Sequence, residues 1–130
     1  MTKDEIVAYW LNSADIDSKA MENLFSNGHY TWSLFVGHLV LEKLLKAYYV
    51  KSVGTEIPYI HDLLGLAKKG NLILTDEQSD FLDEVTTFNI KARYPDYKNR
   101  FYKRATEAFT REYVTKIKEF QLWLLKKINT

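Results

Sequence analysis

The stretch from Thr31 to Val50 constrains the fold more than any other part of the chain. Its apolar residues follow helical spacing and occupy nearly every side of the predicted helix. A surface helix shows one apolar stripe, whereas a helix that is apolar on most sides must be contacted by several neighbours. The sequence therefore predicts a central, enclosed helix. It also contains ionisable residues that would be costly in lipid, which argues against a membrane span: His38, Glu42, Lys43 and Lys46.

Periodicity and capping signals predict the helices on either side of this stretch. Thr2-Lys-Asp-Glu5 and Thr75-Asp-Glu-Gln78 have the spacing of a capping box, so helices are expected to begin there. A short helix is expected from His61 to about Lys69, and a long last helix from a start between Lys98 and Thr106 to about Ile128.

The breaks between these helices fall at glycine and proline. They lie at Asn27-Gly28, in residues 51–58, at Gly70 and in residues 93–96. Five helices with short connections predict one all-α domain over residues 1–130. We expect a four- to five-helix up-and-down antiparallel bundle.

The composition of the 130-residue chain excludes several kinds of site. It has no cysteine, so disulfides, thiolate zinc sites, iron–sulfur clusters and a cysteine nucleophile are excluded. Three histidines without a His-Glu-x-x-His pair predict no metal site, and no motif predicts a cofactor. The first five residues lack the basic and apolar regions of a secretory signal, so a cytoplasmic location is expected.

The formal net charge of +1 conceals a division of charge along the chain. Residues 1–90 hold 7 Lys/Arg against 13 Asp/Glu, whereas residues 91–130 hold 11 against 4. Such a division favours a polyanionic partner, or association of unlike faces, over a uniformly neutral surface.

His38, Glu42 and Lys46 form a polar stripe on the otherwise apolar central helix, because four residues separate each from the next. Ionisable groups in such a place cost free energy unless they are paired. One interpretation is an internal network that lines a cleft, where Glu42 raises the pKa of His38. The alternatives are a purely structural network and a stripe that faces water.

Two further polar elements follow. His61-Asp62 opens the short helix, where a negative Asp62 suits the helix dipole and His61 is either a loop residue or part of a site. Residues 91–104 hold six Lys/Arg and four aromatic residues. Cations contact phosphate and flat rings stack on bases, so this composition is typical of a nucleotide or single-stranded RNA surface. The alternative is a packed connector whose rings belong to the core.

Three motifs in this order resemble the HEPN family of small prokaryotic helical domains. They are Phe35-Val-Gly-His38-Leu-Val-Leu-Glu42-Lys43-Leu-Leu-Lys46-Ala47, His61-Asp62-Leu63-Leu64-x-Leu66 and Ala92-Arg93-Tyr94-Pro95-Asp96. The resemblance covers nearly the whole chain. It implies a helical bundle, usually a homodimer, that binds nucleotides or RNA and is often encoded beside a minimal nucleotidyltransferase.

For this chain the resemblance implies a non-catalytic nucleotide- or RNA-binding domain. Its partner would be a minimal nucleotidyltransferase in a two-gene, toxin–antitoxin-like system. The residues expected around the phosphate are Lys43, Lys46, His61 and Arg93, with Tyr94 beside a base. The supporting polar network is expected to consist of His38, Glu42 and Asp62.

Some members of this family are toxin ribonucleases, in which an Arg, four to six further residues and a His from each protomer meet at the dimer interface. This chain departs from that pattern, because no histidine follows His61. Lys and Arg at their usual pKa are poor substitutes for a group that moves a proton near neutral pH. Two alternatives stay open: a diverged metal-independent ribonuclease that uses His38 or His61, and a purely structural interaction module.

Overall fold

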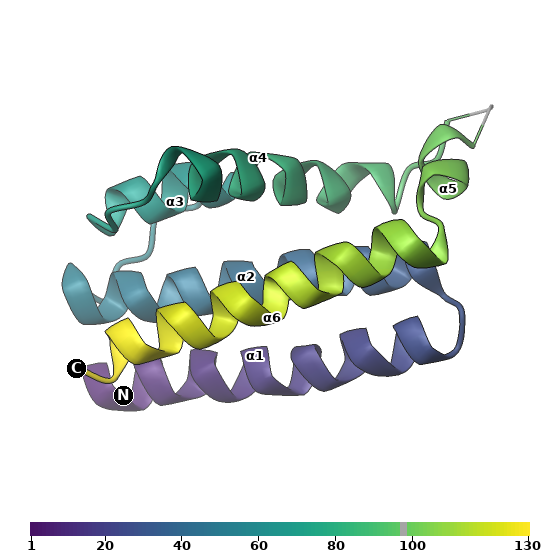
Figure 1. The fold of residues 1–130 in the computed structure, drawn as a ribbon. Helices are drawn as coiled ribbons and strands as arrows, with labels where there is room; N and C mark the ends of the chain where they lie inside the picture. Colours follow the sequence, from purple (N-terminus) through teal and green to yellow (C-terminus); the bar gives the residue numbers. More distant parts are fainter. Residues whose placement is uncertain (97–98) are drawn as a thin grey trace.

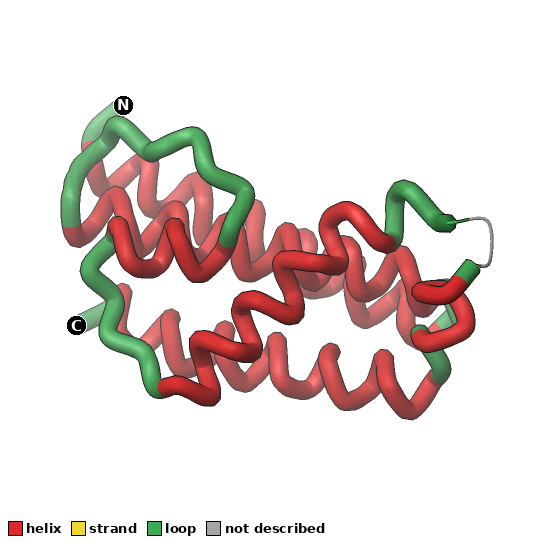
Figure 2. Tube along the Cα trace, turned by 90° about the horizontal axis from the view of Figure 1, so that it is seen from above, coloured by secondary structure: helices red, strands yellow, loops and turns green. Residues whose placement is uncertain are grey.

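The computed structural model describes residues 1–96 and 99–130, which form an all-helical bundle (Figure 1). The four long helices alternate in direction along the chain, so the arrangement is up-and-down and antiparallel, as Figures 1 and 2 show. The all-α prediction is confirmed. Within the described ranges there is no strand, and six helices are present: α1 (Lys3–Ser26), α2 (Tyr30–Ser52), α3 (Leu63–Lys69), α4 (Asp76–Lys91), α5 (Arg100–Arg104) and α6 (Glu107–Ile128).

Local signals set the starts of α1 and α4. The hydroxyl of Thr2 accepts a hydrogen bond from the N–H of Glu5 at 3.1 Å, and the Glu5 carboxylate accepts one from the N–H of Thr2 at 2.9 Å. Thr75 and Gln78 repeat this reciprocal pair at the start of α4. Both predicted capping boxes are therefore confirmed. After α1 the chain turns at Gly28, whose φ of 80° is easily adopted only by glycine.

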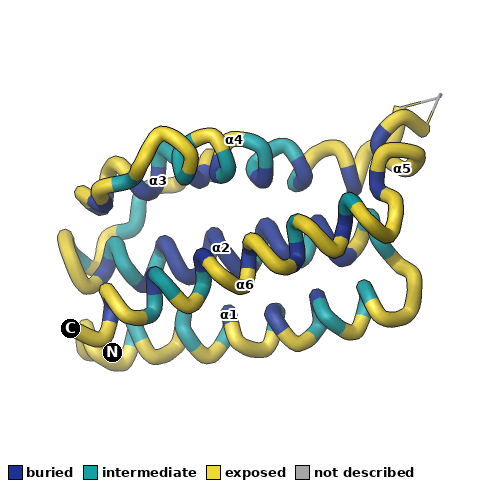
Figure 3. The backbone as a smooth tube through the Cα atoms, in the orientation of Figure 1, coloured by how far each residue is buried: buried dark blue, intermediate teal, exposed yellow. Residues whose placement is uncertain are grey.

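The predicted central helix is confirmed as α2. Eleven of its residues are buried, and it packs against all five other helices of the described chain. The buried positions on α2 contrast with the long exposed outer side of α1 in Figure 3. None of the helices in residues 1–96 and 99–130 is long and apolar enough to cross a membrane.

The sequence predicts one last helix where the structure has two. Ala105 has a ψ of 64°, which is not helical and ends α5. The hydroxyl of Thr106 then accepts a hydrogen bond from the N–H of Phe109 at 3.2 Å and caps α6. Tyr97 and Lys98 of the predicted basic and aromatic segment lie outside the described residues.

An aromatic cluster around Phe88 holds the segment after α4 against the bundle. The ring of Phe88 is fully buried, and its centre lies 5.5 Å from that of Phe101 on α5. It also lies 6.2 Å from Phe109 and 5.2 Å from Tyr113, both on α6. Helix α5 is thereby kept close to the core.

Gly37 allows α2 and α6 to approach closely. A Cβ at this position would lie 2.5 Å from Cδ1 of Ile117 and 3.2 Å from Sδ of Met21. Both neighbouring side chains are fully buried, so neither can turn into solvent to make room.

We expect Gly37→Ala to lower the free energy of unfolding by about 1 kcal/mol or more. Overpacking a filled core costs about 1–3 kcal/mol, which exceeds the gain in helix propensity from alanine. Ile117→Val removes the Cδ1 methyl, so the two changes together should cost less than their sum. Urea unfolding of the single and double variants measures this coupling.

Gly54→Ala is the matched control, because nothing lies within 4 Å of the added Cβ. We expect it to leave the free energy of unfolding nearly unchanged. Equal stabilities of Gly37→Ala and Gly54→Ala would contradict the close approach of α2 and α6.

Candidate functional site

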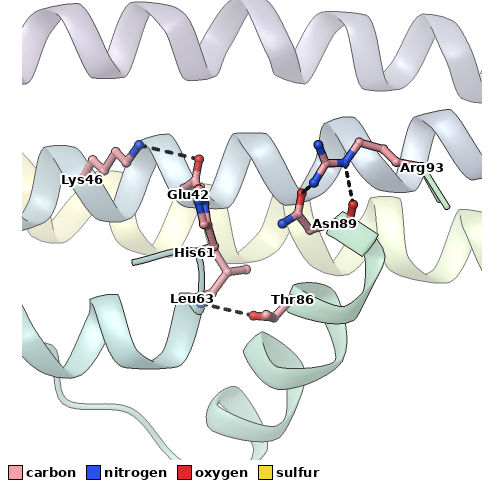
Figure 4. Close-up of polar contacts among 7 residues, drawn as sticks. All are labelled: Glu42, Lys46, His61, Leu63, Thr86, Asn89 and Arg93. Carbon is pink, nitrogen blue, oxygen red and sulfur yellow. Dashed lines mark hydrogen bonds and ion pairs between the residues drawn. The ribbon is translucent and has the colours of Figure 1, made fainter. Parts of the chain in front are cut away.

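The polar stripe of α2 and the loop before α3 meet in an ion-pair cluster (Figure 4). Glu42 is only 8% exposed. Its Oε2 lies 3.6 Å from Nζ of Lys46, and its Oε1 lies 3.4 Å from Nδ1 of His61. The Glu42 carboxylate therefore joins two of the three sequence motifs. We call Glu42, Lys46 and His61 the Glu42 cluster.

Backbone contacts fix the loop that carries His61. The N–H of Leu63 donates a hydrogen bond to Oγ1 of Thr86 at 3.1 Å, and this hydroxyl donates to the carbonyl of Leu82 at 2.8 Å. The first turn of α3 is thus docked on α4 (Figure 4). The ring of Tyr59 packs edge-on against His61, with 5.4 Å between ring centres.

A small pocket opens beside the Glu42 cluster. Nζ of Lys46 lies 4.8 Å from the centre of the Trp10 ring, a cation–π contact that connects α1 to the site. Trp10, Lys46 and residues 57–61 line a cavity of about 200 Å³. Pockets for drug-sized ligands begin at roughly 300 Å³, so this one suits a group of few atoms.

His38 belongs to the same stripe but lies inside the bundle, at 1% exposure. Neither of its ring nitrogens has a hydrogen-bond partner among the described residues. Burial lowers the pKa of His38 below its ordinary value of 6.5 and outweighs the opposite effect of the Glu42 carboxylate. Glu42 raises this pKa as expected, but the larger effect of burial makes the net shift downward.

Arg93 lies in the turn after α4. Its Nε donates to the carbonyl of Asn89 at 2.8 Å, and one terminal nitrogen donates to Oδ1 of the same residue at 3.0 Å. The guanidinium carbon lies 5.3 Å from the ring centre of Phe35 and 5.3 Å from that of Tyr94. No carboxylate in the described residues forms an ion pair with Arg93.

Arg93 and the Glu42 cluster lie along the same helix but at separate turns. Phe35 precedes Glu42 by seven residues, which is about 10 Å along a helix. Figure 4 shows Arg93 nearer to the start of α2 than Glu42 and Lys46 are. His38 lies between Phe35 and Glu42 on α2, and the charge of Arg93 also lowers the pKa of His38. Three of the predicted phosphate-binding residues, Lys46, His61 and Arg93, therefore follow one another along α2 instead of lining one enclosed pocket, and we call them the track.

A broader groove opens at the Arg93 end of this track. Its cavity of about 530 Å³ lies between the start of α2 and the turn after α4. Lys91 and Arg93 supply positive charge to its lining, and Trp32 and Tyr102 supply aromatic rings. We call it the Arg93 groove. The sequence identified the 91–104 side of this groove and missed residues 28–32, which carry no local signal of that contact.

Two predicted site residues do not join the track. Nζ of Lys43 lies 2.6 Å from Oδ2 of Asp17, so Lys43 faces α1. Asp62 lies near the N-terminus of α3, as expected, and is its N-cap residue. Its side chain makes no capping hydrogen bond. Within residues 1–96 and 99–130, no group of three or more His, Asp or Glu side chains is arranged to hold a metal.

Three residues that position the site were not predicted. Asn89 precedes Arg93 by four residues, a spacing that permits side-chain contact on a helix and that could have identified the pair. Trp10 and Phe35 are aromatic residues on helices, where the same pattern usually indicates core packing. Only their contacts with Lys46 and Arg93 show a second role.

Acidification is expected to destabilise the folded protein through His38. Because burial lowers its folded-state pKa, the unfolded chain binds this proton more readily, and stability falls as the pH drops through 6.5. One proton contributes at most about 1.4 kcal/mol per pH unit. The groups facing the ring are Glu42, His61 and Arg93.

Urea unfolding of the wild type and His38→Leu between pH 7.5 and 5.5 measures this effect. The variant keeps the other two histidines, so their contributions to the pH dependence are shared. We expect the wild type to lose more stability than His38→Leu over this interval. Parallel stability curves for the two proteins would show that His38 does not resist protonation.

The chain also matches a family of known domains. The family model described as the HEPN domain matches residues 7–128, which is nearly the whole chain. No curated protein and no solved structure matches significantly. The family match agrees with the helical bundle and with the three motifs that the structure arranges along α2. The chain belongs to the HEPN domain family.

Proposed function

We propose that this HEPN domain is a non-catalytic RNA- or nucleotide-binding module whose main phosphate contact is Arg93. The observation that carries the proposal is the arrangement of this guanidinium, which Asn89 and two aromatic rings hold in place. No carboxylate in the described residues neutralises it. A guanidinium already held in place loses less side-chain freedom on binding, and its remaining N–H groups can donate to phosphate oxygens.

Exposed rings beside Arg93 support a base contact. Tyr94 is 67% exposed and Tyr102 is 69% exposed, and Tyr102 also lines the Arg93 groove. Base stacking on such rings contributes about 1–3 kcal/mol per base. We assign the neighbouring base to Tyr94, because its ring already contacts the Arg93 guanidinium.

Two other arginines of this region are engaged elsewhere. Nε of Arg100 lies 3.2 Å from Oδ2 of Asp96, and Arg104 is paired with Glu84. Their charges are partly offset, so we expect them to add to the positive potential without supplying the first phosphate contact.

The other end of the track supplies weaker contacts in this proposal. Lys46 and His61 would contact a neighbouring phosphate, with His38, Glu42 and Asp62 as supporting groups. Glu42 orders both side chains but offsets part of their charge, so their contribution should be smaller than that of Arg93. Lys43 should contribute least, because Asp17 is already paired with it.

The biological setting of this proposal comes from the family. We place the domain as a homodimer beside a minimal nucleotidyltransferase in a two-gene, toxin–antitoxin-like system. The excess of Lys/Arg in residues 91–130 supports a polyanionic ligand. The Arg and His motif of the ribonuclease members is lacking after His61, which supports a binding role.

The contact between His61 and Glu42 favours a second candidate, a diverged metal-independent ribonuclease. A carboxylate that orients an exposed imidazole is an arrangement found in general bases. His38 cannot take this role, because it is buried away from substrate. Under this alternative, RNA cleavage would persist in a chelator and disappear in His61→Ala. Cleavage retained in that variant would assign the activity to other groups.

Fluorescence anisotropy with a labelled mixed-sequence RNA tests the binding proposal. We expect saturable binding at low salt that weakens as salt rises. Arg93→Ala should weaken it by roughly tenfold and lower the slope of log K against log salt by about 0.7, the value for one single-strand contact. Tyr94→Ala should weaken binding without changing that slope, because stacking releases no counterion.

Lys127→Ala is the matched control. It removes one positive charge beside an aromatic ring, since Nζ of Lys127 lies 5.1 Å from the ring centre of Trp123. Lys127 is near the C-terminus of α6, at the opposite end of the bundle from α5 (Figure 1). An equal loss of affinity in both variants would contradict the proposal. So would an absence of binding at low salt to RNA and to mono-, di- and trinucleotides.

A further inference from the structure

A second groove lies between α4 and α6, and aromatic side chains form its floor. Phe81 stacks on Tyr113, with 6.2 Å between ring centres and 10° between planes, and its centre lies 5.9 Å from that of Phe120. Phe120 in turn lies 5.2 Å from Trp123. These rings line a cavity of about 520 Å³, which we call the α4–α6 groove.

The rim of this groove is acidic. One cation, Lys116, is among its described lining residues, against four carboxylates: Glu77, Asp80, Glu84 and Glu119. The pKa of Tyr113 on the floor is raised, first by burial and second by the negative charge of Glu84 at the rim. An apolar floor with an acidic rim is the reverse of the Arg93 groove.

The charges of this rim are only partly compensated. Nζ of Lys116 lies 3.5 Å from a carboxylate of Glu112, outside the groove, and lies over the Tyr113 ring at 5.2 Å. Within the described chain, the three exposed carboxylates of the rim form no ion pair: Glu77, Asp80 and Glu119. These groups remain available to a ligand.

We propose that the α4–α6 groove docks a segment of another protein in which Lys or Arg residues flank a large apolar side chain. The apolar side chain would rest on the rings of Phe81 and Phe120, in the manner of a buried interface anchor. The cations would pair with the rim carboxylates and lie over the exposed parts of the rings.

Charge complementarity selects this occupant. An acidic rim repels nucleic acid and acidic peptides, and it lowers the energy of a basic segment. The length of the groove agrees with a peptide segment as occupant. Tyr113 and Trp123 are ten residues apart on α6, which is about 15 Å of helix. That length accommodates roughly four residues of an extended chain, more than a single ion would need.

A defined peptide tests this docking site. The probe is a fluorescein-labelled heptapeptide, Lys-Leu-Lys-Trp-Lys-Leu-Lys, titrated with the full chain. We expect saturable binding of this peptide, at least roughly tenfold weaker binding of the version with Gly in place of Leu and Trp, and none of the version with Glu in place of Lys. Equal affinity for the first two would overturn the role of the aromatic floor.

Substitutions at the rim test the location. Glu77→Lys with Asp80→Lys should weaken peptide binding by roughly tenfold or more, since like charges then face each other. The milder pair Glu77→Gln with Asp80→Asn should also weaken peptide binding, with less strain on the start of α4. Thermal melts check that both double variants are folded.

The control is Asp83→Lys with Glu56→Lys. It changes the net charge by the same amount, and both residues are exposed outside the groove lining. We expect the affinity of this variant for the peptide to differ from that of the wild type by less than about twofold. A loss equal to that of the rim variant would overturn the proposal, as would NMR shift changes confined to residues outside α4 and α6.

Two further readouts separate this proposal from other outcomes. RNA binding through Arg93 should survive in the rim variants, so failure of either proposal is distinguishable from failure of the other. Light scattering gives the oligomeric state of each protein. A wild-type dimer that the rim substitutions convert to a monomer would identify a second copy of this chain as the occupant and overturn the docking of another protein.

Discussion

The enclosure of α2 determines where every other element of this domain lies. A helix that buries residues on most of its surface must be covered from several directions, and α2 contacts all five other described helices. Close packing at Gly37 then leaves no room for a side chain between α2 and α6.

Because α2 is enclosed, burying the ionisable residues of its polar stripe costs free energy of folding. Glu42 is almost completely buried, so removing either of its partners would leave a carboxylate with less compensation. Its contacts with Lys46 and His61 connect the stability of α2 to the position of the loop before α3. His38 shows the other outcome of burial, since burial lowers the pKa of a ring whose nitrogens have no hydrogen-bond partner among the described residues. The ionisable residues of this stripe are therefore costly to bury and are also candidates for function.

Opposite charges are gathered at separate places on the bundle. The turn after α4 carries Arg93 with exposed rings, whereas the α4–α6 groove carries uncompensated carboxylates around an aromatic floor. Aromatic side chains contribute to both surfaces, and the charge beside them decides which ligand each favours. Membership of the HEPN family indicates a nucleotide- or RNA-related domain. The proposed RNA contact and the proposed docking site therefore lie on two separate surfaces of that domain.

The sequence alone determined the helical class, the family, the capped starts of α1 and α4 and the central place of α2. These features depend on spacing between near neighbours, which capping boxes and periodicity record directly. The separate α5 was missed, because the break at Ala105 carries no glycine or proline. Only the tertiary structure decided which cations are free and which are paired. Lys43 meets Asp17, Lys46 meets Glu42, and Arg93 meets two rings and an amide, although all three are equally basic in the sequence. The Glu42–Lys46 and Asn89–Arg93 contacts follow a four-residue spacing that the sequence shows. The Lys43–Asp17 and Arg93–Phe35 contacts join residues from different elements, and no local pattern encodes the distance between them.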